Sequence, residues 1–296
     1  PYTAQQVLQK RLLENHGYRV VTSPIDSLPD TLRVWDEAER KIYLSEALDH
    51  QNRTFQLAHA LCFIEFSDVL DAITGSTSFT SESHATRCHV ELANYFAAAF
   101  LMPYDAFLDK AEETRYDLDR LAAAFAVSIE QAAQRLTTLQ RDGRRGVPFF
   151  FLRIDKAGNV TKRFNATSFS IAEYGGACPV RDVPVGLPTP GVLLPQLVEL
   201  PDGQQFFTIS RTTERPVYSM ETQDRRLAIA LGCESQHAHR VIYANGLDLS
   251  PSGAASKIGI NCHLCPRHNC GQRAYDPIVT ELTTDTKRRG ETRYES

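Results

Sequence analysis

The spacing of hydrophobic residues changes once along this chain, near residues 143–146, and the change limits the folds that the chain can adopt. Before it, apolar residues recur with the period of an α-helix, as in residues 3–16 and 52–66. After it, apolar and polar residues alternate over 149–154 and 160–164, as in a β-hairpin. The sequence therefore predicts an α+β protein with a mainly helical domain at 1–145, an antiparallel-sheet-containing domain at 146–275 and a polar tail at 276–296.

Three of the seven cysteines lie within nine residues of one another. Cys262, Cys265 and Cys270 form a C-x2-C-x4-C run on a loop bounded by glycine and proline. A loop this short brings three thiolates around one metal centre at little entropic cost. The other cysteines are scattered, so the pattern favours one thiolate-ligated metal site in a reducing cytoplasm over a secreted disulfide framework.

A closed metal site needs a fourth ligand from elsewhere in the fold. Cys233 is the first candidate, because it follows a glycine that we expect to end a short helix at 224–231. Cys178 is the second candidate, and His263 or His268 could complete a zinc site. Residue types alone do not separate zinc from an iron–sulfur cluster, since four cysteines suit both.

Net charge and hydropathy exclude several classes of protein. With a formal net charge of −4, the chain is unlike a bare nucleic-acid-binding domain, which is usually basic. No apolar run approaches the ~18 residues that a membrane-spanning helix needs. The chain begins at Pro1 without an initiator methionine or a signal-peptide pattern, and we therefore expect a cytoplasmic protein that lacks its natural N-terminal segment.

Two segments of the first domain resemble the IrrE/ImmA-like zinc metallopeptidases. That family pairs a helix carrying H-E-x-x-H with a later helix that reads roughly E-x-x-A-N-x-F-A-x-x-L-L-M-P. Residues 56–63 and 91–103 resemble these two helices in order and spacing. The first motif places two zinc-binding histidines on one helix face, with the glutamate between them as general base. The resemblance implies a metallopeptidase-like fold over residues 1–140.

The catalytic residues of that motif are not retained. His59 occupies the first ligand position, whereas Ala60 replaces the general base and Phe63 replaces the second histidine. Glu91 remains at the third position, but one imidazole and one carboxylate cannot hold a catalytic zinc ion, which takes three protein ligands. We therefore expect no peptidase activity. His59 is then either a half-buried structural residue or part of a pair with Glu91 that braces the helices or orients a ligand.

Charged and aromatic residues follow one face of the second of these helices. Arg87, Glu91, Asn94 and Tyr95 stand at positions i, i+4, i+7 and i+8. A salt bridge together with helix packing would explain most of this pattern. Alternatively, Arg87 binds a phosphate group, and Tyr95 stacks on the same ligand or hydrogen-bonds it.

The segments at 175–179, 231–240 and 262–274 resemble the C-terminal domain of the short-chain fatty acyl transcriptional regulators, in which an IrrE-like domain lies upstream. The resemblance covers nearly the whole chain. It implies an N-terminal helix-turn-helix that binds promoter DNA, absent here, and an effector that is coenzyme A or a short acyl-CoA such as propionyl-CoA. It also implies control of propionate (methylcitrate cycle) and related carbon metabolism, and a [4Fe–4S] cluster on the C-terminal cysteines.

Coenzyme A carries phosphates and an adenine, so its site needs cationic and aromatic side chains. The predicted hairpin offers an aromatic run at 149–151 and the four cations Arg153, Lys156, Lys162 and Arg163. Alternatively, these cations are the solvated face of an amphipathic hairpin.

These features together predict the sensor part of a cytoplasmic transcription regulator that is not an enzyme and forms homo-oligomers, either dimers or tetramers. The predicted cluster ligands are Cys233, Cys262, Cys265 and Cys270, and the predicted effector-binding residues are Arg87, Tyr95, Arg153, Lys156, Lys162 and Arg163. Two alternatives stay open: a zinc-stapled interaction module without a small ligand, and an active metallopeptidase, against which Ala60 and Phe63 argue.

Overall fold

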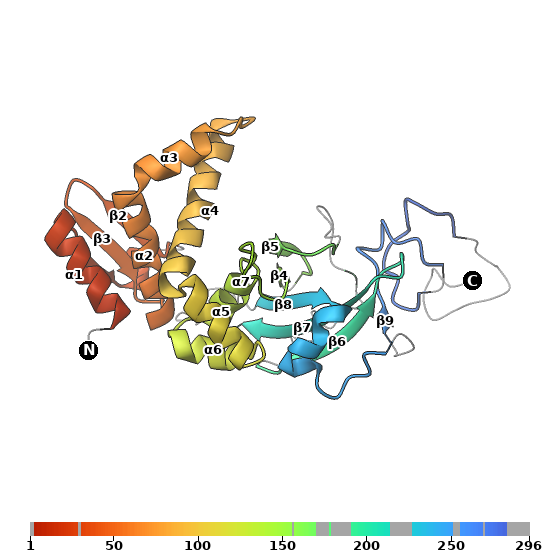
Figure 1. The fold of residues 1–296 in the computed structure, drawn as a ribbon. Coiled ribbons are helices and arrows are strands. Elements are labelled where there is room, and N and C mark those ends of the chain that lie inside the picture. The colour runs from red at the N-terminus through yellow and green to blue at the C-terminus, as the bar shows by residue number, and fades with distance from the viewer. Residues whose placement is uncertain are drawn as a thin grey trace. The chain divides into compact units, whose positions relative to one another are not determined.

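Figure 1 shows the computed structural model of the protein, which describes residues 3–28, 31–155, 157–169, 178, 191–213, 227–250, 255–268 and 270–282. These residues form two compact units. The first unit contains the described residues up to Lys110 together with Asp119–Arg135, and the second contains Ala111–Leu118 and the described residues from Leu136 onward. Every helix within them is too short or too polar to cross a lipid bilayer.

The first unit combines helices with a small mixed sheet. The sheet has the order β1-β3-β2, in which β1 (Arg19–Ser23) is parallel to β3 (Lys41–Ser45) and β2 (Arg33–Asp36) is antiparallel to it. The helices in this part of the chain are α1 (Ala4–His16), α2 (His50–Glu65), α3 (Ser67–Gly75), α4 (Glu82–Leu101), α5 (Tyr104–Glu113), α6 (Leu118–Phe125) and α7 (Ile129–Leu136), with a short 3-10 helix η1 (Ile25–Ser27).

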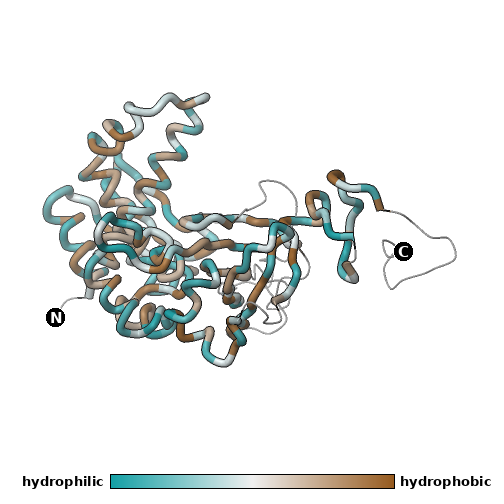
Figure 2. Tube along the Cα trace, turned by 45° about the vertical axis from the view of Figure 1, so that its right-hand side comes forward, coloured by the Kyte–Doolittle hydropathy of each residue, from teal (hydrophilic) through white to brown (hydrophobic). Residues whose placement is uncertain are grey.

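Local sequence explains why these helices form where they do. Thr3 and Gln6 make a capping box at the start of α1, and the side chains of Asp49 and Ser81 cap α2 and α4. Hydrophobic and hydrophilic residues alternate along the helices in Figure 2, as one buried face requires. The helices predicted at 3–16, 52–66 and 87–101 are confirmed, although α4 begins earlier than predicted.

The second unit is built on a six-stranded sheet of order β5-β4-β8-β7-β6-β9. Neighbouring strands are antiparallel except β6 and β9, which are parallel. The elements are β4 (Phe150–Ile154), β5 (Val160–Asn165), β6 (Leu194–Glu199), β7 (Gln205–Thr213), β8 (Leu227–Glu234) and β9 (Ser256–Lys257), with the 3-10 helices η2 (Ser235–Arg240) and η3 (Ile242–Ala244). The α+β class and the hairpin predicted at 149–154 and 160–164 are thereby confirmed.

The helix predicted at 224–231 is wrong, because residues 227–234 form the strand β8 between β4 and β7. All of its residues except the first and last are buried, and a short apolar run buried on both faces cannot be told from a helix by its period. Gly232 does not end a helix. A Cβ atom at this position would overlap the ring of Phe150 and come within 2.9 Å of the Phe207 carbonyl oxygen.

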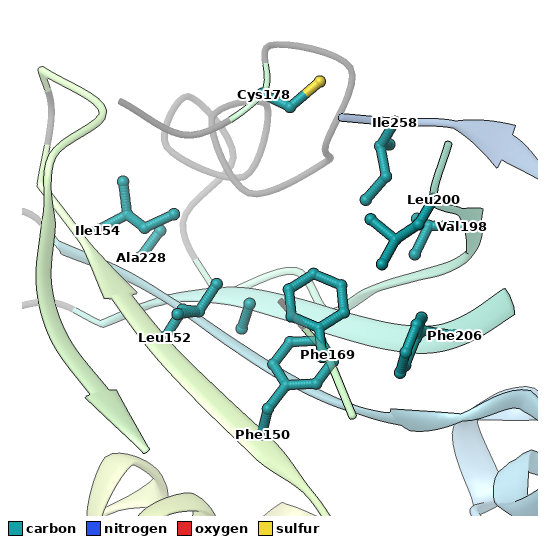
Figure 3. Packing of buried hydrophobic residues seen from close by; sticks show 11 residues of the cluster. Phe150, Leu152, Ile154, Phe169, Cys178, Val198, Leu200, Phe206, Ala228 and Ile258 are labelled. Carbon is teal, nitrogen blue, oxygen red and sulfur yellow. The ribbon is translucent and has the colours of Figure 1, made fainter. Parts of the chain in front are cut away.

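One face of this sheet carries the buried core that leads to the cysteine loop. The rings of Phe150, Phe169 and Phe206 pack together, with a stacked pair of centroids 4.1 Å apart at Phe150 and Phe169 (Figure 3). Cys178 and Ile258 belong to the same cluster (Figure 3). The core therefore places a cysteine from the middle of the second unit beside the chain segment that follows β9.

Candidate functional site

A pocket in the second unit gathers cysteines that are far apart in the sequence. It is lined by Cys178, Cys262, Cys265 and Cys270 together with Lys257, Gly259, Asn261, Arg267 and Arg273. All of these cysteines are free thiols; Cys270 is half-buried and the other three are buried. The three cysteines of the C-x2-C-x4-C run therefore share the pocket with Cys178, which was the second candidate from the sequence.

Backbone N–H groups point at two of these sulfur atoms. The N–H of Gly259 donates to Cys178 Sγ at 3.4 Å, and the N–H of Ala274 donates to Cys262 Sγ at 3.5 Å. Donors of this kind stabilise a thiolate and tune a metal centre bound to it. The pocket thus offers both thiol ligands and the surrounding hydrogen bonds that a thiolate site uses.

Gly259 lets the cysteine loop approach closely. A Cβ atom built on this residue would lie 2.7 Å from Cys265 Sγ, a distance that van der Waals repulsion forbids. The residue before it ties the loop to the sheet, since the N–H of Ile258 donates to the Glu199 carbonyl at 3.0 Å. Arg267 strengthens this connection by donating to the same Glu199 carbonyl at 3.0 Å.

The donor set fits a thiolate-bound metal centre, although the thiols are not gathered tightly. Within the described ranges, no three His, Cys, Asp or Glu side chains lie close enough together to hold a single metal ion. A lone zinc ion needs four ligand atoms at about 2.0–2.3 Å from one point. A [4Fe–4S] cluster binds each thiolate to its own iron atom, so it accepts sulfurs that stand farther apart.

The other predicted metal ligands are not among the residues that line this pocket. Cys233 is fully buried in β8, where its register partner is Phe207, and it is not among the residues that line the pocket. Burial, followed by the charge of Glu234, raises the pKa of the Cys233 thiol to about 12. His263 stacks on the ring of Tyr275, and neither His263 nor His268 lines the pocket.

The peptidase-like site of the first unit has a different composition. His59 is 6% exposed, and its Nδ1 atom lies 3.0 Å from the guanidinium of Arg33. Burial, and then the charge of Arg33, lowers the pKa of His59 to about 4, and burial lowers the pKa of Arg33 to about 10. His59 is therefore a neutral imidazole that accepts a hydrogen bond from Arg33. Its ring also packs against Phe63, which stands at the second histidine position.

The predicted face of α4 is exposed. Arg87, Glu91 and Tyr95 are exposed, and Glu91 accepts a hydrogen bond from Asn94 at 3.4 Å. Among the described residues, no hydrogen bond or ion pair joins Glu91 to His59. The predicted His59–Glu91 pair is therefore not formed. The guanidinium of buried Arg135 lies 5.6 Å from the Tyr95 ring centroid, which gives Tyr95 a structural cation–π contact.

The hairpin cations divide between the two faces of the sheet. Arg153 and Lys162 are direct register partners, and Arg163 is the partner of the buried Leu152. Because side chains alternate along a strand, Arg153 and Lys162 lie on one face and Arg163 on the other. Lys162 also lies 5.3 Å from the Phe164 ring centroid. Lys156 falls outside the described residues.

Comparison with known proteins gives matches along nearly the whole chain. The model for the IrrE N-terminal-like domain matches residues 13–137, and the model for the short-chain fatty acyl coenzyme A regulator C-terminal domain matches residues 138–294. The chain is 42% identical to the HTH-type transcriptional regulator RamB of Mycobacterium tuberculosis, over 95% of this chain and 60% of RamB. It is 46% identical to the propionyl-CoA carboxylase regulator of Cereibacter sphaeroides, over 81% of this chain and 52% of that protein.

A third relative, the HTH-type transcriptional regulator PrpR of Mycobacterium tuberculosis, is 35% identical over 94% of this chain and 57% of its own length. A solved structure, described as a Mycobacterium tuberculosis transcriptional regulator, superposes with a TM-score of 0.90 at 34% identity, covering 99% of this chain and 88% of that one. The chain thus spans between 52% and 60% of the length of these three curated relatives. All three are named as regulators and none as an enzyme.

Proposed function

Because this chain belongs to the short-chain fatty acyl coenzyme A regulator family, we propose that it is the sensor part of a cytoplasmic transcription regulator. The proposed effector is coenzyme A or a short-chain acyl-CoA such as propionyl-CoA, and the proposed targets are genes of propionate and related short-chain fatty acid metabolism. Promoter DNA would be bound by a helix-turn-helix domain outside this chain. The observation that carries the proposal is the family match over residues 138–294, which include the sheet and the cysteine loop.

The effector can control such a protein only if it binds one conformation better than another. A coupling free energy of about 1–3 kcal/mol between effector and DNA is typical of allosteric proteins. Homo-oligomers, as dimers or tetramers, would give the effector a subunit arrangement to alter. In this scheme the first unit keeps the peptidase-like fold but has lost the residues that catalyse peptide hydrolysis.

Arg153 and Lys162 are the cations that we propose for the effector's phosphates, because they lie together on one face of the hairpin. Thermal unfolding of the full chain with propionyl-CoA, with coenzyme A and with neither tests the proposal. A ligand that binds the native state raises the melting temperature by mass action. An unchanged melting temperature at saturating concentrations of both would contradict the sensor role. A shift that survives Arg153→Ala and Lys162→Ala would place the phosphates elsewhere.

For the metal centre we propose that Cys178, Cys262, Cys265 and Cys270 are the ligands, and that Cys233 is not. Support comes from the shared pocket, from the N–H donors to two of the sulfurs, and from the burial of Cys233 in the middle of the sheet. When bound, a [4Fe–4S] cluster would supply a one-electron redox centre that links these two segments. Zinc at the same thiols would supply a structural link only.

Anaerobic purification with metal and sulfide analysis tests this assignment. We expect brown protein with iron and sulfide near about four each per chain. Cys178→Ala should lose the colour, and Cys233→Ala, as the matched control, should keep it. The reverse result would restore Cys233 as the ligand. Colourless protein with one zinc per chain would show that the site binds zinc instead of a cluster. It would favour the alternative function, a zinc-stapled interaction module.

A further inference from the structure

Arg273 lies buried within the cysteine loop, with 4% of its surface exposed. One terminal nitrogen, Nη1, donates to the Cys262 carbonyl at 3.1 Å. The other, Nη2, donates to the Cys265 carbonyl at 3.3 Å and also to the Arg267 carbonyl. The flat guanidinium therefore fixes the backbone at both cysteines of the C-x2-C pair and at a third residue just beyond them.

Among the described residues, Arg273 lacks two interactions that a buried arginine needs, a partner for one N–H group and a counter-ion. Its Nε–H is buried and has no hydrogen-bond partner among the described residues. In the same part of the chain, no carboxylate lies within ion-pair distance of its guanidinium, whereas Arg267 lies 3.6 Å from the Glu199 carboxylate. A buried charge without a counter-ion is strongly unfavourable, and among the described residues only three carbonyl oxygens offset the charge of Arg273, so its burial calls for a further electrostatic reason.

The pocket that Arg273 lines supplies such a reason. Four cysteine side chains share it, and a metal centre binds them as thiolates. A divalent ion with four thiolates carries a net charge of about −2, and an iron–sulfur cluster on four thiolates is likewise an anion. A buried guanidinium beside that centre would balance part of its charge.

We infer that Arg273 is a positioning and charge-balancing residue of the four-thiol centre, an inference that rests on the metal site of the proposed function. Its hydrogen bonds to three carbonyls hold Cys262 and Cys265 facing the pocket. Its positive charge stabilises the bound centre in its more reduced, more negative state, and so raises the reduction potential of a cluster. The two contributions can be separated, because lysine keeps the charge and cannot reproduce the planar fork.

The test uses the full chain reconstituted anaerobically, as wild type, Arg273→Met, Arg273→Lys and the control Arg33→Met, which removes an arginine of the first unit. Cluster loss to a chelator is followed by visible absorption, and the midpoint potential by spectroelectrochemical titration. Arg273→Met should lose the cluster about tenfold faster or more, as supporting-residue changes typically do, and should have a more negative potential. Arg273→Lys should also lose the cluster faster while keeping a potential close to that of the wild type. Arg33→Met should keep both the wild-type loss rate and the wild-type potential, because Arg33 belongs to the first unit and contacts His59 instead of the cysteine loop.

The outcomes separate this inference from the metal site itself. If the wild type binds neither iron nor zinc, the proposed metal centre fails. If the wild type binds a cluster and Arg273→Met matches it in both loss rate and potential, the metal centre stands and the role of Arg273 is overturned. If the wild type binds zinc, the rate of zinc release replaces the cluster measurements, and an unchanged rate in Arg273→Met overturns the role. Should Arg273→Met fail to fold, a folded Arg273→Lys with an unchanged loss rate overturns it equally.

Discussion

Each unit places an arginine beside residues of metal-binding type, half-buried Arg33 in the first and buried Arg273 in the second, but the two arginines act differently. In the first unit Arg33 donates directly to His59 Nδ1, so the lone pair of this nitrogen already accepts a hydrogen bond. In the second unit Arg273 donates to backbone carbonyls and leaves the thiols free to bind. If the proposed metal centre forms, the difference teaches that the atom to which a neighbouring cation is hydrogen-bonded decides whether its charge excludes a metal or supports one.

The two sites also differ in the charge that surrounds each arginine. Arg33 lies 3.0 Å from His59 Nδ1, and the neutral His59 gives it no negative charge. The pocket of the second unit offers up to four thiolates beside Arg273. The cation of the first unit therefore faces a neutral ring, whereas the cation of the second faces thiols that would become anionic on binding the proposed metal centre.

The largest expected difference between the sites is in metal content. Cys265→Ser should remove essentially all metal bound to the anaerobic protein, because three thiols cannot close the site. His59→Ala should leave the metal content unchanged. Elemental analysis of both variants checks this, with Cys62→Ser, a buried cysteine of the first unit, as the control for general thiol loss. Metal that disappears with His59 would show that the first unit still binds it.

The next largest effect is on the pH dependence of stability. The pKa of His59 in the folded protein is about 4, below the ordinary value of 6.5, so the unfolded chain binds the proton more readily. Stability should therefore fall as the pH drops from 6.5 towards 4 and level off below it, by at most about 3 kcal/mol. Urea unfolding across this range measures the loss. His59→Gln should remove much of the dependence; an identical dependence in both proteins would contradict the assignment.

Alanine substitutions at Gly259 and Gly75 compare how closely side chains pack against the backbone in the two units. Gly259→Ala places a Cβ 2.7 Å from Cys265 Sγ and should destabilise the protein by about 1–3 kcal/mol through overpacking. Gly75→Ala meets nothing within 4 Å at the end of α3 and should leave stability unchanged or slightly raised. Denaturant midpoints of the two variants measure this. Equal midpoints would mean that the cysteine loop moves to accept the methyl group without cost.

The smallest effect is expected on the exposed face of α4. Arg87→Ala should change the free energy of unfolding by less than about 0.5 kcal/mol, because the side chain is exposed and away from the core. The same variant also tests whether Arg87 binds the effector. A smaller melting-temperature shift with propionyl-CoA than in the wild type would give Arg87 a role in effector binding, and an equal shift would leave it a solvated surface residue.

Much of the molecule follows from local sequence. Helical periodicity predicted the main helices, and alternation predicted the β4–β5 hairpin. The substitutions at Ala60 and Phe63 were enough to predict that the peptidase chemistry is lost. Three pocket cysteines were also predictable, because nine residues of loop keep Cys262, Cys265 and Cys270 together in any fold.

Only the tertiary structure decided the remaining features, since they depend on contacts between distant segments. The apolar run of β8 is compatible with a helix or a strand, and its place between β4 and β7 settles it as a strand. Once Cys233 lies in that strand, its side chain is fixed by the register with Phe207, while Cys178 reaches the pocket from another segment. Arg33 likewise meets His59 across 26 residues of chain, a contact that no local pattern encodes.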